Sequence, residues 1–337
     1  MAATAFLSLP EPTLRRIAGP PVRSPEGWTL DAQSHALLWL MRAVRESVEY
    51  SDVVGARRTL ERSARVLAPR EKQRLRIDDR DLPGGDGPRR ARIYSGAAAG
   101  DLAPGLLWFH GGGFVLGSIE SHDGICRALA ARAAVTVVSV DYRLAPEHRF
   151  PASVDDAVAA ATWVLENGHR IGIDRDAVAV GGDSAGGNLA AVVAQSLRAA
   201  PRRPVFQVLA YPATDATCRQ PSHVFFAEGL ILTERTVQWF LNHYIADRSL
   251  ETEPRVSPLL ASDLQGLPPA FVATAGFDPL RDEGRAYADR MRAAGVPVEH
   301  VCAQGSLHGF FSTAGGLRES ARVLSLTADA VRRALHP

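Results

Sequence analysis

Short apolar strands alternate with helical segments along most of this chain of 337 residues. From Gly105 onward, each apolar run is short enough for a strand and is followed by a stretch with the apolar spacing of a helix. The expected strands are residues 106–109, 135–140, 177–180, 205–209, 270–275 and 298–301. Because parallel strands need helical crossovers between them, this pattern predicts an α/β fold with a parallel sheet covered by helices on both faces.

Two more strands are expected ahead of this alternation, at residues 74–80 and 90–94. The segment between them, residues 82–88, is rich in glycine and proline and is typical of a turn. These two strands therefore form an antiparallel start to the sheet. They bring the expected sheet to eight strands, most of them parallel.

The first 70 residues are expected to form a layer outside the main α/β domain, which we place at residues 71–337. Residues 1–27 are rich in proline, and we expect an irregular, poorly fixed arm there. Helices are expected within residues 30–50 and, with a less regular pattern, at 52–67. The first of these helices has apolar residues at helical spacing at Leu37, Met41, Val44 and Val48.

The charge of the chain is balanced, with 38 basic against 37 acidic residues. No overall field attracts nucleic acid or an anionic membrane, so a small and largely neutral molecule is the expected partner. The N-terminus has no basic segment and its apolar run is short, so we do not expect a signal peptide. No apolar run approaches the length of an integral membrane span.

Cysteine usage points to a reducing compartment. The three cysteines, Cys126, Cys218 and Cys302, are odd in number and far apart, which fits neither a disulfide framework nor a zinc cluster. We therefore expect a cytoplasmic protein with no metal site and no cofactor.

A serine stands between an apolar β-branched run and a helical run, in the pattern G-x-S-x-G that extends from Gly182 to Gly186. A serine that projects its hydroxyl above a sheet takes a strained backbone conformation, and side chains two positions away would collide with their neighbours. The glycines remove both collisions, and the following helix directs free N–H groups toward the serine. Ser184 is therefore the candidate nucleophile. The alternative is a glycine-rich helix start with an incidental serine.

Three successive glycines follow the expected strand at 106–109, directly after His110. Their backbone N–H groups can approach a ligand without obstruction, as an oxyanion hole requires, and we assign Gly111 and Gly112 as donors together with the N–H of Ala185. For His110 we favour a role in shaping the glycine loop over proton transfer. A phosphate-binding loop is disfavoured, because neither G-x-G-x-x-G nor a P-loop pattern matches here.

Two polar residues follow later strands at the same predicted end of the sheet. Asp278 stands closest to the end of the strand at 270–275, whereas Asp282 and Glu283 fall at the start of the next helix, where acidic residues are favourable with the helix dipole. His308 lies after the last strand and is flanked by glycine. The chain order Ser184, Asp278, His308 is the order of α/β-hydrolase triads, so His308 is the expected general base.

The motifs together resemble the hormone-sensitive lipase family of α/β-hydrolases, the bacterial carboxylesterases also called family IV. The likeness extends over about residues 73–336. It rests on five motifs in the right order, at residues 110–113, 141–151, 182–187, 278–284 and 308–310. The resemblance implies an α/β-hydrolase fold with a helical cap, a triad of Ser184, Asp278 and His308, and an oxyanion hole supplied by the glycines.

The resemblance further implies a serine carboxylesterase that hydrolyses short to medium acyl esters through an acyl-enzyme. The stretch 141–151 would be mainly structural, and the cap would be built from residues before about 70 and from residues near 213–250. Homodimers are common in the family, often through the edge of the last strand, so a homodimer is an expectation here.

Residues 213–250 interrupt the strand–helix alternation and carry seven large apolar side chains, on a loop and on a helix expected to begin at Thr233. They are Phe225, Phe226, Leu230, Leu232, Trp239, Phe240 and Tyr244. We expect this insertion to set substrate size, with Phe226 and Trp239 as candidate substrate-binding residues. The alternative is that these side chains only pack against the sheet.

Two other functions stay open. Plant gibberellin receptors resemble the same family but lack its catalytic histidine, so the presence of His308 disfavours a non-catalytic receptor here. An amidase or deacetylase would use the same constellation of residues and differ only in the leaving group.

Overall fold

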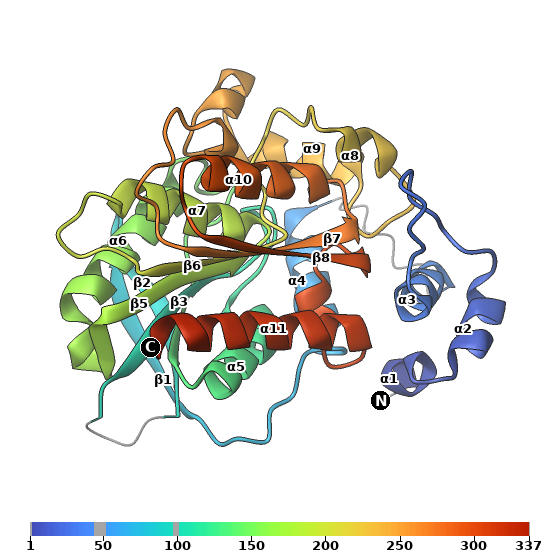
Figure 1. The fold of residues 1–337 in the computed structure, drawn as a ribbon, viewed down its shortest axis with the longest axis horizontal. Coiled ribbons are helices and arrows are strands. Elements are labelled where there is room, and N and C mark those ends of the chain that lie inside the picture. The colour runs from blue at the N-terminus through green and yellow to red at the C-terminus, as the bar shows by residue number, and fades with distance from the viewer. Residues whose placement is uncertain (1, 44–51, 97–100, 337) are drawn as a thin grey trace.

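An eight-stranded sheet forms the centre of the computed structural model, which describes residues 2–43, 52–96 and 101–336 (Figure 1). The strands are β1 (Arg76–Gly84), β2 (Gly87–Ser95), β3 (Ala103–Phe109), β4 (Thr136–Val140), β5 (Ile173–Asp183), β6 (Phe206–Ala210), β7 (Ala270–Phe277) and β8 (Val298–Leu307). Their order in the sheet is β1-β2-β4-β3-β5-β6-β7-β8. The pairs β1/β2 and β2/β4 are antiparallel and the other five pairs are parallel, which confirms the predicted mostly parallel eight-stranded sheet.

Helices cover both faces of the sheet, as predicted (Figure 1). They are α5 (Ile119–Ala133), α6 (Ala152–Asn167), α7 (Ala185–Leu197), α10 (Arg281–Ala293) and α11 (Arg318–Leu335). One hydrophobic core lies under α6, α7 and α10, and a second lies under α5 and α11. The single-turn helices η1 (Gly168–Ile171), η3 (Pro258–Leu260) and η4 (Phe310–Thr313) lie in the connections.

The last strand is longer than the sequence indicated. β8 continues to Leu307, whereas the expected strand covered only residues 298–301. The pairing with β7 shifts register near Gly276 and resumes at the pair Phe277 and Leu307. Since β8 is an edge strand, its polar residues need no apolar layer on both sides. The strand therefore ends directly at His308.

The prediction of an irregular N-terminal arm is wrong. Residues 2–18 form two helices, α1 (Ala2–Leu7) and α2 (Glu11–Ala18), and both Leu7 and Leu14 are fully buried in a small core with Leu37. The prolines are compatible with α2 because Pro10 is its N-cap and Pro12 lies in its first turn, where a backbone N–H has no partner to lose.

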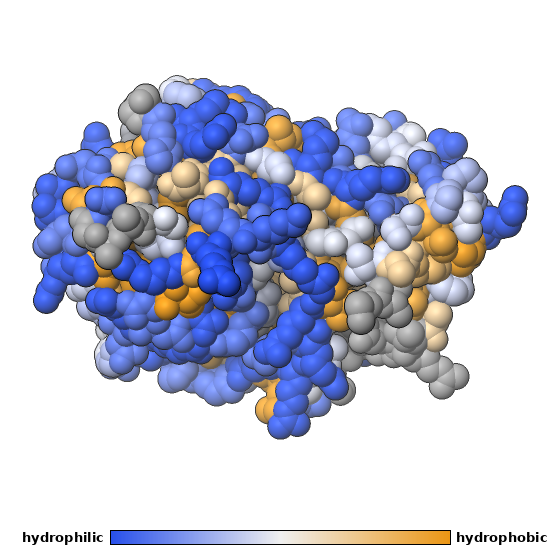
Figure 2. Space-filling view, turned by 90° about the horizontal axis from the view of Figure 1, so that it is seen from below, coloured by the Kyte–Doolittle hydropathy of each residue, from blue (hydrophilic) through white to orange (hydrophobic). Residues whose placement is uncertain are grey.

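Two helices follow the arm, as expected. They are α3 (Ala32–Ala43) and α4 (Val53–Ala64), whose N-cap Asp52 accepts a hydrogen bond from the N–H of Gly55. The predicted apolar positions Val44 and Val48 lie outside the described residues. Figure 2 shows a face of the molecule on which hydrophilic side chains cover most of the surface, with apolar side chains in separate patches.

The insertion forms α8 (Pro221–Phe225), α9 (Glu234–Tyr244) and the single turn η2 (Arg248–Thr252). Thr233 is the N-cap of α9, as predicted, and its side chain accepts a hydrogen bond from the N–H of Thr236. In Figure 1, α8 and α9 lie above the end of the sheet toward which β7 and β8 point, on the same side as α3 and α4. Within the described ranges, no helix combines the length and apolarity that crossing a bilayer requires.

Candidate active site

Ser184 lies at the sharp turn between β5 and α7 and has a strained backbone, with φ of 55° and ψ of −118°. Three backbone hydrogen bonds hold it. Its N–H donates to the carbonyl of Ala210 at 2.9 Å, and its own carbonyl accepts from the N–H of Asn188 at 3.0 Å and of Ala213 at 3.2 Å. The strain is therefore stabilised by neighbouring strand and helix backbone.

The two glycines of the pentapeptide have the steric role expected of them. A Cβ built on Gly182 would stand 2.3 Å from the backbone of Gly186, and one built on Gly186 would stand 1.9 Å from the carbonyl oxygen of Phe109. Contacts this short with rigid backbone exclude any side chain at either position.

The structure brings Ser184, His308 and Asp278 into one chain of hydrogen bonds. His308 Nε2 is 2.9 Å from Ser184 Oγ, and His308 Nδ1 is 2.7 Å from Asp278 Oδ2. Asp278 is fully buried, and its other carboxylate oxygen accepts the N–H of Leu280 at 2.9 Å. The carboxylate thus orients the imidazole so that Nε2 can take the serine proton.

Tyr211 supports the histidine from the side. It follows β6 with a positive φ of 35°, is almost fully buried, and packs edge-on against the His308 ring at 5.0 Å between centroids. Tyr211 could not be recognised from the sequence, because its contact with His308 depends on how the end of β6 lies next to the loop after β8.

The glycine loop lies beside the serine turn, but its first glycine is already engaged. The N–H of Gly111 donates to Asp183 Oδ1 at 3.2 Å and is also 3.2 Å from His122 Nε2. Asp183 immediately precedes Ser184, so this bond joins the glycine loop to the serine turn. Gly111 was predicted to hold an oxyanion, but its N–H is directed at this buried carboxylate instead.

The next two glycines differ from Gly111 in their backbone N–H groups. Gly112 and Gly113 have positive φ values of 120° and 62°, and within the described part of the chain neither N–H has a hydrogen-bond acceptor. The N–H of Ala185, the first residue of α7, belongs to the first turn of a helix, where backbone donors have no partner in the helix itself.

Asp183 is a buried carboxylate whose charge is balanced locally. Burial by itself would raise the pKa of Asp183, but the charge of His122 and a hydrogen bond to its Nε2, at 3.3 Å, hold that pKa below its ordinary value. His122 is therefore a structural residue, in contact with both the glycine loop and Asp183.

His110 shapes the loop, as the sequence analysis favoured. Its Nδ1 is 2.8 Å from the carbonyl oxygen of Gly111, and its ring stacks on Tyr142 at 4.3 Å between centroids. Complete burial, and then the nearby charge of His122, lower the pKa of His110 to about 3. The ring is therefore neutral at physiological pH and does not exchange protons with substrate.

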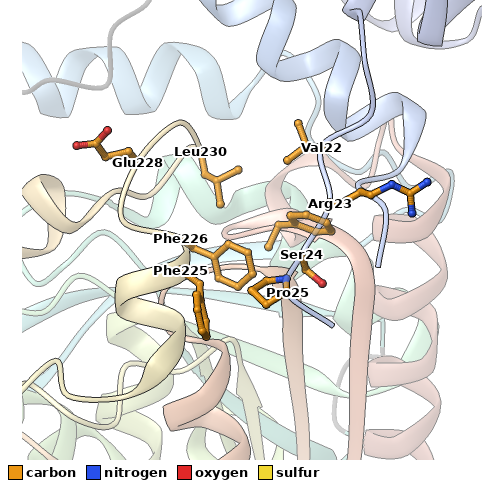
Figure 3. A pocket seen from close by; sticks show the side chains of 9 residues that line it. Val22, Arg23, Ser24, Pro25, Phe225, Phe226, Glu228 and Leu230 are labelled. Carbon is orange, nitrogen blue, oxygen red and sulfur yellow. The ribbon is translucent and has the colours of Figure 1, made fainter. Parts of the chain in front are cut away.

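The two predicted substrate-binding residues lie in different surroundings. Phe226 is only 4% exposed and packs on Phe277, the residue before Asp278, in a small core. Together with Phe225 it lines a pocket of about 370 Å³, and in Figure 3 its ring points toward Pro25 of the arm. Trp239 is half-buried and packs against Phe240 at 5.3 Å between centroids.

Phe240 is the aromatic residue that contacts the glycine loop. A Cβ built on Gly113 would stand 2.2 Å from both Cγ and Cδ1 of the Phe240 ring, so the ring lies directly on this glycine. In the sequence analysis, Phe240 was not distinguished from the other aromatic residues of the insertion. Only the three-dimensional placement of α9 over the glycine loop distinguishes it.

Comparisons with known proteins agree with this geometry. A family model described as alpha/beta hydrolase fold matches residues 106–312. Carboxylic ester hydrolase LipN of Mycobacterium tuberculosis is 41% identical over 302 residues, which cover 86% of this chain and 80% of LipN. Ethyl acetate hydrolase of Pseudomonas putida is 39% identical over 288 residues, which cover 83% of this chain and 90% of that enzyme. Among solved structures, the hyperthermophilic esterase of the archaeon Pyrobaculum calidifontis has a TM-score of 0.81 and 41% identity, covering 87% of this chain and 97% of the esterase.

The chain therefore belongs to the α/β-hydrolase fold family, among the esterases that resemble hormone-sensitive lipase. It is a carboxylic ester hydrolase, since relatives at this level of identity are hydrolases of carboxylic esters. Both the fold and the enzyme class expected from the sequence are confirmed.

Proposed function

We propose that this carboxylesterase hydrolyses short to medium acyl esters with Ser184 as nucleophile, His308 as general base and Asp278 as the carboxylate that orients it. His308 takes the proton of Ser184 as the hydroxyl attacks the ester carbonyl, then gives it to the leaving alcohol. Water then repeats the sequence on the acyl-enzyme, and the acid is released. The continuous hydrogen-bond chain of 2.9 Å and 2.7 Å through these side chains carries the proposal.

We further propose that the N–H groups of Gly112, Gly113 and Ala185 hold the oxyanion. This assignment replaces Gly111 by Gly113, since the Gly111 N–H already donates to Asp183. Donors that meet the charge only as it develops favour the transition state over the bound ester.

The proposed substrate range is supported by the names of the relatives and by the position of the insertion. One relative is named for the hydrolysis of ethyl acetate, a short ester, which supports a preference for small acyl groups. Within the insertion, we propose that Phe240 and Trp239 border the ester next to the oxyanion hole. Phe226 would act indirectly, because it packs on Phe277 and is almost completely buried.

The test is a panel of p-nitrophenyl esters from acetate to dodecanoate, with the wild type and Ser184→Ala. Activity should be greatest on the shorter chains, and Ser184→Ala should lose about 10⁴-fold or more in kcat. Full activity in Ser184→Ala would contradict the assignment of the nucleophile. Highest activity on the longest chains would contradict the acyl range.

Amide hydrolysis is the second candidate, because the same residues can attack an amide carbonyl. A comparison of kcat/KM on a matched ester and amide separates the two activities. We expect the ester to be favoured, as the relatives are ester hydrolases.

The cap and the assembly are also proposals. We place the cap in residues 1–70 and 213–250, around a catalytic domain of residues 71–337, and propose a homodimer formed through the outer edge of β8. Sedimentation equilibrium of the wild type, compared with a variant carrying Val301→Lys on that strand, tests the dimer. A wild-type monomer at micromolar concentration would overturn it.

A further inference from the structure

Glu283 is a buried carboxylate in the first turn of α10, 1% exposed, that contacts two other parts of the chain. Its Oε1 accepts the N–H of Thr214 at 2.6 Å and of Asp215 at 3.2 Å. Its Oε2 is 2.7 Å from His223 Nε2. An acidic residue that only complemented the helix dipole would not require burial or these contacts.

One of these contacts leads to the nucleophile. The residue before Thr214 is Ala213, whose N–H donates to the carbonyl of Ser184 at 3.2 Å. Asn188 Nδ2, one turn into α7, donates to the carbonyl of Ala213 at 2.8 Å. Glu283 therefore fixes the segment that in turn holds the strained backbone of Ser184.

A second connection leads to the catalytic carboxylate. The N–H of Leu280 donates to Asp278 Oδ1 at 2.9 Å, and the N–H of Gly284 donates to the carbonyl of Leu280 at 3.1 Å. The first turn of α10, which carries Glu283, is thus hydrogen-bonded to the loop that presents Asp278. A displacement of Glu283 would be transmitted to both ends of the triad.

The third connection leads to the insertion. His223 lies on α8, and its neighbour Ser222 forms two backbone-to-side-chain bonds with Asp282, each of 3.1 Å. Ser222 Oγ also donates to the carbonyl of Pro279 at 2.5 Å. The insertion therefore docks on the residues that immediately follow Asp278.

The arm docks on the same turn. Arg281 donates to Glu26 at 2.7 Å, and its guanidinium lies over the rings of Phe226 and Trp28, at 5.1 and 5.4 Å from their centroids. Figure 3 shows the arm and the residues after α8 on opposite sides of the pocket that Phe226 lines. The successive residues Arg281, Asp282 and Glu283 thus join both parts of the cap to the catalytic domain.

His223 and Glu283 form a buried pair, joined at 2.7 Å, with side chains that are 3% and 1% exposed. Burial opposes the charged imidazole, but electrostatic interactions with Cys218 and Glu283 outweigh it and raise the pKa of His223 to about 10. Burial raises the pKa of Glu283, and the hydrogen bond from His223 opposes that effect. Asp215 also faces Glu283. Removing one partner of such a pair is more damaging than removing both, because it leaves an uncompensated buried charge.

We propose that Glu283 is a positioning residue of the esterase reaction and that His223 of the insertion is its counter-ion, so that docking of the cap and alignment of Ser184 with Asp278 depend on one another. The inference rests on the function proposed above. Glu283 acts through the segment beside Ser184 and through the loop of Asp278.

The test compares Glu283→Ala, Glu283→Gln, His223→Gln and the double variant Glu283→Gln/His223→Gln on p-nitrophenyl acetate, at a temperature well below the unfolding midpoint of each. We expect Glu283→Ala to lower kcat by about 10- to 100-fold with little change in KM, since roughly 1 Å of misplacement at the reacting groups can cost about 100-fold. Glu283→Gln should recover part of this loss, because its amide oxygen still accepts the N–H of Thr214. The double variant should have a higher kcat than His223→Gln alone.

Asp289→Asn is the matched control, because Asp289 lies on the same helix in an exposed pair with Arg292, and this variant should keep wild-type kcat. A Glu283→Ala enzyme that unfolds at lower temperature but keeps wild-type kcat has lost only stability, and this result overturns the proposal. So does a double variant no more active than His223→Gln. Ser184→Ala separates the two proposals: if that variant is inactive while the Glu283 variants keep their kcat, only the positioning role fails.

Discussion

The ring of Phe240 lies on the backbone of Gly113, so close that a Cβ on the glycine would stand 2.2 Å from the ring. Gly113 follows β3 in the catalytic domain, whereas Phe240 is on α9 of the insertion. The insertion therefore contacts the loop to which we assign the oxyanion hole. This contact gives the insertion a direct influence on the space around the ester carbonyl.

Phe240→Ala should allow esters with a bulky group next to the carbonyl to be hydrolysed more efficiently. Removing the ring opens space beside Gly113, so kcat/KM for p-nitrophenyl pivalate relative to acetate should rise about 10-fold, the usual effect of a few methyl groups in an apolar pocket. The alcohol side is examined in parallel with tert-butyl acetate against methyl acetate. Whichever ratio rises shows which part of the ester lies beside the ring.

Phe225→Ala is the control for Phe240→Ala. Phe225 is an aromatic residue of the same insertion that is 55% exposed and lines the pocket between the insertion and the arm. It should leave both ratios unchanged. An equal loss of activity on all esters in Phe240→Ala would mean that the ring only contributes packing.

Gly186→Ala should abolish the folded enzyme, whereas Gly187→Ala should only weaken it. The new methyl group at position 186 would stand 1.9 Å from the carbonyl oxygen of Phe109, which is fixed in β3. At position 187 it would meet Cβ of Pro212 at 3.0 Å, a contact that a small shift can relieve at about 1–3 kcal/mol. Soluble yield and thermal unfolding measure both effects, and a stable Gly186→Ala enzyme would contradict the expected rigidity of the serine turn.

The sequence was sufficient to find the three residues of the hydrogen-bond chain, because each directly follows a strand of the parallel sheet. Their proximity is a consequence of topology, since the carboxyl ends of parallel strands meet at one edge. Which of the three successive glycines has its N–H engaged by another side chain is a different matter. That choice depends on the position of the Asp183 carboxylate, and no local pattern encodes it.

Contacts between the insertion and the rest of the chain could not be predicted from the sequence either. The pair of His223 and Glu283 and the contact of Phe240 with Gly113 join residues far apart in the chain. Such pairs follow no periodicity, because they are set by how α8 and α9 pack on the sheet. The helix dipole explained Glu283 adequately from sequence alone, and only its burial and contacts led to the role that we propose.

The stability of the enzyme should fall in mild acid because of His110. Its folded-state pKa of about 3 lies below the ordinary 6.5, so the unfolded chain binds a proton that the folded protein does not. The contribution of neutral His110 to the free energy of unfolding is fully present above pH 6.5 and is lost as the pH falls toward 3. Between pH 6.5 and pH 5, the unfolding free energy of the wild type should fall by about 1.5 kcal/mol more than that of His110→Asn.

Urea unfolding at each pH measures this difference, and His336→Asn is the control because His336 is exposed. The total stability of His110→Asn will be lower at every pH, since the bond to the carbonyl of Gly111 changes. Only the slope with pH matters here. Parallel stability curves for His110→Asn and the wild type would contradict the depressed pKa.

The N-terminal arm should behave as a packed part of the molecule rather than as a loose tail. Leu14 is fully buried among other apolar side chains, with 0% of its surface accessible to solvent. Leu9, between the two helices, is 38% exposed. Leu14→Ala should weaken the docking of the arm by about 2–5 kcal/mol, the usual cost of removing a buried leucine side chain. Limited proteolysis should then cleave residues 1–20 at least 10-fold faster than in the wild type, while Leu9→Ala should have no effect. If the wild-type arm is cleaved as fast as that of Leu14→Ala, the arm does not hold its place in solution, and its contact with Arg281 through Glu26 contributes nothing to the cap.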